Sequence, residues 1–111
     1  MTILFFKVED VLNDASTEAT APNGEKGIAT EKVRYLRDKL QELGPGAQLV
    51  LYGDWAKDWN FDDEKCTPNG KYLIKKLDRK GLHIMDKTTD SEDPIMDYLK
   101  THHVDHHIVL A

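Results

Sequence analysis

Four apolar residues follow one another near the start of the chain, from Ile3 to Phe6, without a polar break. A short continuous apolar run is typical of a strand that is buried on both faces of a parallel sheet. The chain turns polar directly afterwards, at Lys7, Glu9 and Asp10. Because ligands bind at the carboxyl ends of the strands in open α/β sheets, the pattern predicts a central strand that ends in candidate site residues.

Three later segments carry apolar residues at the three- and four-residue spacing of amphipathic helices. The first is residues 30–43, which we expect Thr30 to cap and which ends before Gly44 and Pro45. The second is residues 67–80, with proline at its first helical position. The third opens at Asp93, an acidic cap that is followed by another proline.

Short apolar runs separate these helices and predict three further strands, at residues 48–52, 82–85 and 108–110. A polar turn from Asp86 to Asp90 follows the third strand. Four strands that alternate with three helices predict an α/β fold with a small doubly wound parallel sheet in three α/β/α layers. We expect one domain over residues 1–111, without a separate cap domain.

Two connections are long enough to influence a site at the strand ends. Residues 14–29 are rich in small and turn-forming types, and predict a solvated loop or a flap over the first strand. The loop from Trp55 to Cys66 also contains Trp59 and Phe61 among acidic residues, five of them when Asp54 just before the loop is included. These aromatic side chains either stack on a ligand or a partner's cation, or fold back onto the end of the sheet.

The stretch ILFFKVEDVLND, from Ile3 to Asp14, resembles the first motif of the haloacid dehalogenase (HAD) superfamily. Members usually have an apolar run followed by Asp, any residue, Asp, Gly, Val, Leu and Asn. The first of these aspartates is the phosphoryl-accepting nucleophile and the second is the general acid/base. The matching positions here are Lys7 and Glu9, and Asp10 replaces the glycine. The resemblance implies a HAD-like Rossmannoid fold with strand order third, second, first, fourth.

The other motifs of that family also differ in this chain. A serine or threonine that binds the phosphoryl group follows the family's second strand, where this sequence has Tyr52 and Gly53 before Asp54 and Trp55. The aspartates that hold Mg²⁺ follow the family's fourth strand, whereas the printed sequence stops at Ala111. The resemblance therefore implies a phosphatase fold with degenerate positions at every catalytic motif.

Lysine at the nucleophile position changes the expected chemistry. Phosphoryl transfer in this family needs a carboxylate to attack phosphorus and a divalent cation to neutralise the oxygens. We expect the ammonium group of Lys7 to stand near the metal's place and to pair with Glu9, Asp10 or Asp54, because an unpaired buried lysine is costly. The alternative is that Lys7 reaches solvent.

Four histidines near the end of the chain are the other candidate site. His102 and His106, and likewise His103 and His107, have the four-residue spacing that brings two imidazoles together on a helix. A strand at Ile108 would end that helix before His106. Histidines at a helix carboxyl end also interact favourably with its dipole without any metal.

Composition limits the remaining function classes. The net charge of −5 argues against general binding of nucleic acid or anionic membrane, and the apolar runs are too short to span a bilayer. The lone Cys66 suits a reducing cytoplasm. The favoured hypothesis is a HAD-like domain that has lost catalysis, needs no cofactor, and binds a protein partner, a second copy or a small anionic ligand. The alternatives are a weak Mg²⁺-dependent phosphatase and an engineered or truncated derivative of one.

The residues predicted to bind this ligand or partner share a position at or beyond the strand ends. They are Lys7, Glu9, Asp54, Trp55, Trp59 and Phe61.

Overall fold

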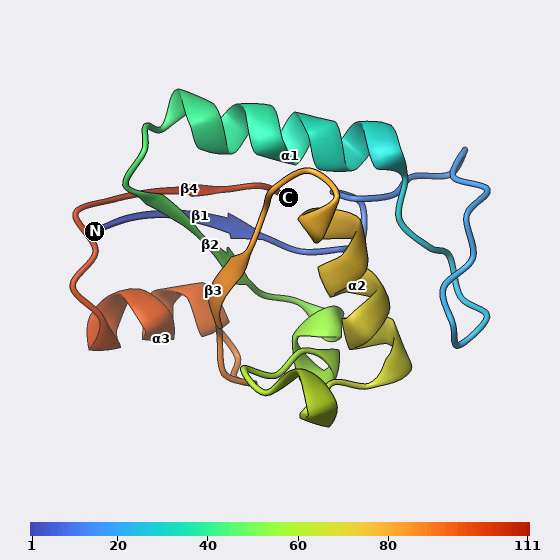
Figure 1. Cartoon of the computed structure of the whole chain (residues 1–111). Coiled ribbons are helices and arrows are strands. Elements are labelled where there is room, and N and C mark those ends of the chain that lie inside the picture. Colours follow the sequence, from blue (N-terminus) through green and yellow to red (C-terminus); the bar gives the residue numbers. More distant parts are fainter.

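The computed structural model describes residues 1–111 and contains one sheet of four parallel strands (Figure 1). The strands are β1 (Thr2–Phe6), β2 (Ala47–Leu51), β3 (Ile84–Lys87) and β4 (His106–Val109), in the order β3-β2-β1-β4. The helices are α1 (Thr30–Glu42), α2 (Pro68–Asp78) and α3 (Pro94–Thr101), with two short 3-10 helices, η1 (Asp54–Asp58) and η2 (Asp63–Lys65). The predicted fold class and strand order are confirmed.

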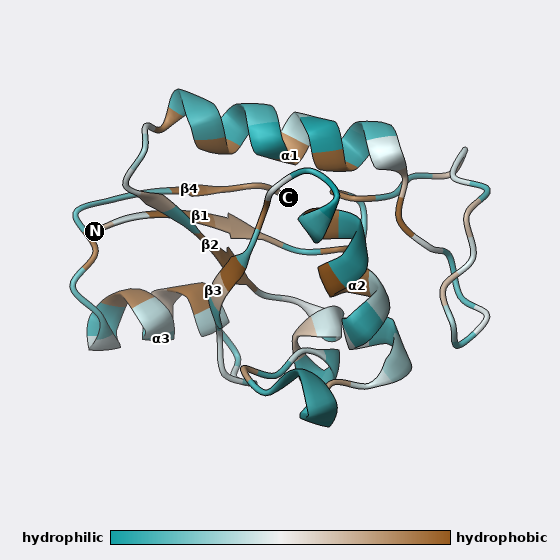
Figure 2. Cartoon of the chain, in the orientation of Figure 1, coloured by the Kyte–Doolittle hydropathy of each residue, from teal (hydrophilic) through white to brown (hydrophobic).

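The sheet separates two apolar clusters, which together explain the three layers. Leu4 and Phe6 of β1 pack with α1 and α2 on one face, whereas Ile3 and Phe5 pack with Tyr98 of α3 on the other. All four strand residues are completely buried. Figure 2 shows the corresponding pattern on α1, which is apolar toward the sheet and polar toward solvent. The unbroken apolar run at the start of the chain therefore forms the centre of both clusters.

Several predicted element boundaries are wrong: β4 begins at His106 rather than Ile108, and β3 extends to Lys87, into the predicted turn. Thr30 is the first residue of α1 rather than its cap, because Ala29 occupies the cap position without a side-chain hydrogen bond. The third strand begins two residues later than predicted, at Ile84. The amide of Leu82 still donates to the carbonyl of Leu77, at 3.0 Å, so the end of α2 uses residues that the apolar pattern assigned to the strand.

The long segment between β1 and α1 is packed at several points. Ala21, Ile28 and Ala29 are buried, and the amide of Ile28 donates to the hydroxyl of Tyr72, at 3.0 Å. Its outer turn contacts α2 through the amide of Asn23, which donates to Asn69 Oδ1 at 3.2 Å. The segment is therefore a loop secured to α2 rather than a merely solvated connection.

No helix of the chain is both long enough and apolar enough to cross a membrane.

Candidate functional site

Lys7 and Glu9 lie side by side beyond the end of β1, where both contact the turn that follows β2. A Cβ atom placed on Gly53 would lie 2.9 Å from Glu9 Oε2 and 3.0 Å from Lys7 Cβ. Gly53 has φ 86° and ψ −171°, a conformation that is essentially restricted to glycine. The absence of a side chain at Gly53 therefore allows Lys7 and Glu9 to approach the turn after β2.

The predicted pairing of Lys7 with an acid is wrong, because no ion pair within 4.0 Å includes Lys7. Glu9 packs against Gly53, and its Oε1 atom is buried without a hydrogen-bond partner. Asp10 is exposed, with φ 64°, and lines a small pocket beside α1. The turn after β1 thus directs its two acids to different surroundings and leaves the ammonium group of Lys7 without either.

Tyr52, which precedes Gly53, uses its hydroxyl group inside the fold. The hydroxyl donates to the carbonyl of Leu110 at 2.6 Å, which joins the end of β2 to the residue after β4. Burial and the negative charge of Glu9 both raise the pKa of Tyr52. Its hydroxyl is consequently a structural donor in this conformation and is already occupied.

The loop from Trp55 to Cys66 mostly follows the second of its two predicted arrangements, in which the aromatic side chains fold back onto the sheet. Trp55 and Trp59 are buried, at 4% and 5% exposure, and belong to the core cluster below α1 and α2. Phe61 is 67% exposed and packs edge-on against Trp59, with ring centroids 4.9 Å apart. Two of the three predicted aromatic anchors are thus core residues, because their large apolar surface is buried against the sheet.

A cleft of about 710 Å³ opens at the carboxyl ends of β2 and β3, between η1 and the loop before α3. Its volume is in the range of small-molecule sites. Gly53 and Asp54 of the predicted site line it together with Phe61. The remaining lining residues are mostly polar: Ala56, Lys57, Asp86, Lys87, Thr88, Thr89, Asp90, Ser91 and Pro94.

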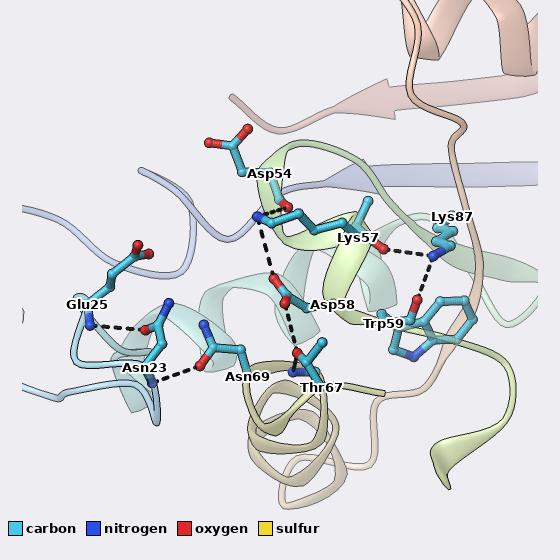
Figure 3. A network of polar contacts seen from close by, with 11 residues as sticks. Asn23, Glu25, Asp54, Lys57, Asp58, Trp59, Thr67, Asn69 and Lys87 are labelled. Carbon is cyan, nitrogen blue, oxygen red and sulfur yellow. Dashed lines mark hydrogen bonds and ion pairs between the residues drawn. The ribbon is translucent and has the colours of Figure 1, made fainter. Parts of the chain in front are cut away.

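One wall of this cleft is tied down by polar contacts that Figure 3 shows. The ammonium group of Lys87, on β3, donates to the carbonyls of Ala56 and Trp59 at 2.9 and 2.6 Å. Asp58 Oδ1 accepts from the hydroxyl of Thr67 at 2.7 Å, which joins η1 to the start of α2. The wall is therefore fixed to both a strand and a helix. The sequence analysis identified residues 86–90 only as a turn. Their polar character at the end of a strand was the signal that could have identified them as residues lining a cleft.

The four histidines are dispersed rather than clustered. His102 follows the last residue of α3 and stacks on Tyr98, with centroids 3.7 Å apart, whereas His107 lies in β4 and packs edge-on against Phe5. Because α3 ends at Thr101, the four-residue spacing does not bring two imidazoles together. No group of three or more His, Cys, Asp or Glu side chains is arranged to hold a metal ion.

Tyr98 and His102 instead belong to a contact that joins α3 to β3. The hydroxyl of Tyr98 donates to Asp86 Oδ2 at 2.9 Å, and His102 Nε2 lies 3.7 Å from the same oxygen. Burial and the hydrogen bond to Asp86 raise the pKa of Tyr98 above its ordinary value. These residues position the loop that forms the second wall of the cleft.

Comparison of the chain with protein-family models, with curated proteins and with solved structures finds no match.

Proposed function

We propose that this chain is a HAD-like binding domain without phosphatase activity, and that Lys7 binds the anionic group of a small ligand. The observation that carries the proposal is the environment of Lys7. It follows the internal strand β1 directly, contacts the turn after β2, and forms no ion pair within 4.0 Å. An ammonium group at a strand end, without a carboxylate of its own, is available to an anion.

The same geometry argues against phosphoryl transfer through the first motif. The attacking group must be a free carboxylate that can approach phosphorus in line. Glu9 is packed against Gly53 with one oxygen buried, and Asp10 lines the separate pocket beside α1. Neither carboxylate occupies the position of Lys7, which argues against the first motif as a nucleophile. A weak phosphatase is the alternative, and an activity assay decides between the two.

The test is a titration with inorganic phosphate and with phenyl phosphate, in which the NMR chemical shifts of the backbone amides report binding. We expect saturable shifts at Lys7, Gly53 and their neighbours, and a loss of about 10-fold or more in affinity in Lys7→Met, since a charged hydrogen bond is removed. Lys71→Met is the matched control, because it removes the same charge from an exposed position on α2.

Two outcomes contradict the proposal. If Lys71→Met weakened binding as much as Lys7→Met, the effect would come from net charge alone. If the wild type hydrolysed phenyl phosphate in the presence of Mg²⁺, and Glu9→Gln or Asp10→Asn abolished the hydrolysis, the phosphatase alternative would replace it.

Self-association is a second candidate, favoured by exposed apolar residues at two places. Phe61 is 67% exposed, whereas Ile108 and Val109 of the edge strand β4 are 42% and 39% exposed. An uncovered edge strand is a template for pairing with another chain. Because the two tryptophans are buried, β4 is the better supported surface. Sedimentation equilibrium of the wild type and of Val109→Lys tests it, and a monomeric wild type would exclude it.

A further inference from the structure

The tripeptide Pro-Asn-Gly occurs twice in this chain, with its asparagine at Asn23 and at Asn69, and the two copies touch each other. The amide of Asn23 donates to Asn69 Oδ1 at 3.2 Å (Figure 3). An asparagine that precedes glycine can react with its own backbone, because glycine has no side chain to keep its amide nitrogen from the side-chain carbonyl carbon. The same three residues therefore stand in two environments, and the environment decides whether they react.

Asn23 and Gly24 lie at the exposed tip of a short hairpin in the long loop before α1. Thr20 and Lys26 pair across this hairpin in an isolated antiparallel bridge. Gly24 has φ 88°, and a Cβ atom placed on it would meet nothing within 4 Å. No neighbouring segment packs against Gly24 on that side, so the peptide has the freedom to change conformation that is typical of loop tips.

The side chain of Asn23 is already folded toward the backbone that follows it. Its Oδ1 accepts from the amide of Glu25 at 3.0 Å, which forms an Asx turn. The ring closed by this hydrogen bond contains both the carbonyl carbon of Asn23, Cγ, and the amide nitrogen of Gly24. The two atoms that would react are therefore held on the same side of one turn, and the hydrogen bond polarises the carbonyl group under attack.

One contact opposes the reaction. The amide of Gly24 donates to the carbonyl of Ala21 at 2.9 Å, and an amide nitrogen attacks only after it has lost its proton. This bond closes a single turn whose residues 22–24 are exposed. Because exposed turns open at a small cost in free energy, the bond slows the reaction without preventing it.

Asn69 has the opposite surroundings. It is 5% exposed, is the second residue of α2, and directs its Oδ1 to the amide of Asn23 rather than to its own following backbone. The amide of Gly70 donates to Thr67 Oγ1 at 3.3 Å, and a Cβ atom on Gly70 would lie 1.9 Å from the carbonyl oxygen of Asp58. Helix, cap and packing hold this peptide, so that attack requires the first turn of α2 to unfold.

We propose that Asn23 is a site of spontaneous deamidation and that the fold protects Asn69 from the same reaction. The amide nitrogen of Gly24 loses its proton to water or hydroxide and forms a bond to Cγ of Asn23, and the side-chain amide leaves as ammonia. Water then opens the cyclic imide at either of its two carbonyls, which gives aspartate or isoaspartate. The sum is one amide and one water to one carboxylic acid and ammonia, without an oxidant or reductant. This inference goes beyond the proposed anion site and involves none of its residues.

The isoaspartate product changes the backbone of the loop as well as its charge. Its main chain passes through the former side chain and is longer by one methylene group, so the turn from Ala21 to Gly24 cannot close as before. We expect the tip to lose the hydrogen bond to Asn69. The aspartate product keeps the original backbone and still has an oxygen that accepts from the amide of Glu25. Isoaspartate formation thus releases the tip of the loop from α2.

The experiment is incubation of the folded, full-length chain at mildly alkaline pH, followed by peptide mapping with mass spectrometry and enzymatic methylation of isoaspartate. We expect Asn23 to deamidate about 10-fold or more faster than Asn69, because only Asn69 must wait for part of a helix to open. In the urea-unfolded chain the two sites should react at similar rates, since the same proline precedes and the same glycine follows each asparagine.

The consequence for the loop is tested on the isoaspartate form, which ion exchange separates because it carries one more negative charge. Freshly purified Asn23→Asp is the matched control, since it adds the same charge to an unaltered backbone. We expect the amide of residue 23 to exchange its hydrogen about 10-fold or more faster in the isoaspartate form than in Asn23→Asp. Equal exchange in the two proteins would contradict the release of the tip from α2.

Three results would overturn the assignment of the site. Equal rates at Asn23 and Asn69 in the folded chain would show that the structure does not control the reaction. An unmodified Asn23 in the folded chain, when the unfolded chain reacts, would show that the hydrogen bond from Gly24 to Ala21 protects it. An Asn69 that stays unreactive in urea would show that its protection does not come from the fold.

Discussion

The carboxyl end of β1 and the carboxyl ends of β2 and β3 are adjacent parts of one sheet edge, yet the cleft at the second is larger than the pocket beside the first. At the end of β1, the side chains of Lys7 and Glu9 lie against Gly53. At the ends of β2 and β3, η1 and the loop before α3 stand apart and enclose about 710 Å³. Lys7 and Glu9, which the sequence predicted as site residues, lie against the neighbouring turn, whereas the turn after β3, which the sequence did not single out, borders the larger space.

The course of the chain after each strand explains the difference. The chain after β2 leads to α2, which packs on the same face as α1, whereas the chain after β3 leads to α3 on the opposite face (Figure 1). Connections that leave adjacent strands toward opposite faces leave a crevice between them. The crevice persists here because Lys87 holds η1 to β3 and Asp86 holds the hydroxyl of Tyr98.

The largest effect should come from a substitution behind the larger cleft. A Cβ atom on Gly70 would lie 1.9 Å from the carbonyl oxygen of Asp58, the last residue of η1. Gly70→Ala must therefore displace backbone, and we expect a loss of about 3 kcal/mol in the free energy of unfolding. Gly46→Ala, where a Cβ atom meets nothing within 4 Å, should change it by less than about 1 kcal/mol. Urea unfolding measures both, and equal midpoints would show that η1 is not held by α2.

A smaller effect is expected where Lys7 and Glu9 contact the turn after β2, from Gly53→Ala. Alanine would have to adopt a backbone conformation that is essentially restricted to glycine, and its methyl group would lie 2.9 Å from Glu9 Oε2. We expect a loss of about 2 kcal/mol from backbone strain together with this contact. Gly44→Ala is the control, because Gly44 also has positive φ, 99°, but an added Cβ atom meets nothing. If the two variants lost the same stability, the packing of Lys7 and Glu9 on Gly53 would contribute nothing.

The smallest effect concerns the loop after β1, which is ordered partly by exposed hydrogen bonds. Hydrogen bonds from Ser16, and then the ammonium group of Lys32, lower the pKa of Asp14 from 3.8 to about 2. The carboxylate therefore contributes stability above about pH 4, and this contribution is lost as the pH falls toward 2. We expect an NMR titration to find this low value in the wild type and a higher one in Ser16→Ala. Ser91→Ala, in the loop before α3, is the control and should leave the pKa of Asp14 unchanged. A wild-type pKa near 3.8 for Asp14 would contradict the proposed effect of these hydrogen bonds.

The secondary structure could be predicted from the sequence because it depends on local pattern, whereas the order of the strands was predicted only from the family resemblance. The run from Ile3 to Phe6 predicted a doubly buried strand, and the structure confirms it. The cap of α3 was equally predictable, since Asp93 accepts from the amide of Met96 as a capping aspartate should. The third strand was misplaced because the end of α2 uses the apolar Leu82, and no local pattern distinguishes the two roles.

For the candidate site, the sequence alone determined that Lys7 and Glu9 follow an internal strand, since an apolar run that turns polar has few other solutions. It could not determine that Lys7 lacks an ion pair, that the tryptophans are buried while Phe61 is exposed, or that Thr88 lies in a cleft. Each of these depends on contacts between segments far apart in the chain. Only the tertiary structure decides whether side chains or open space fill the end of a strand, because that depends on where the neighbouring connections lead.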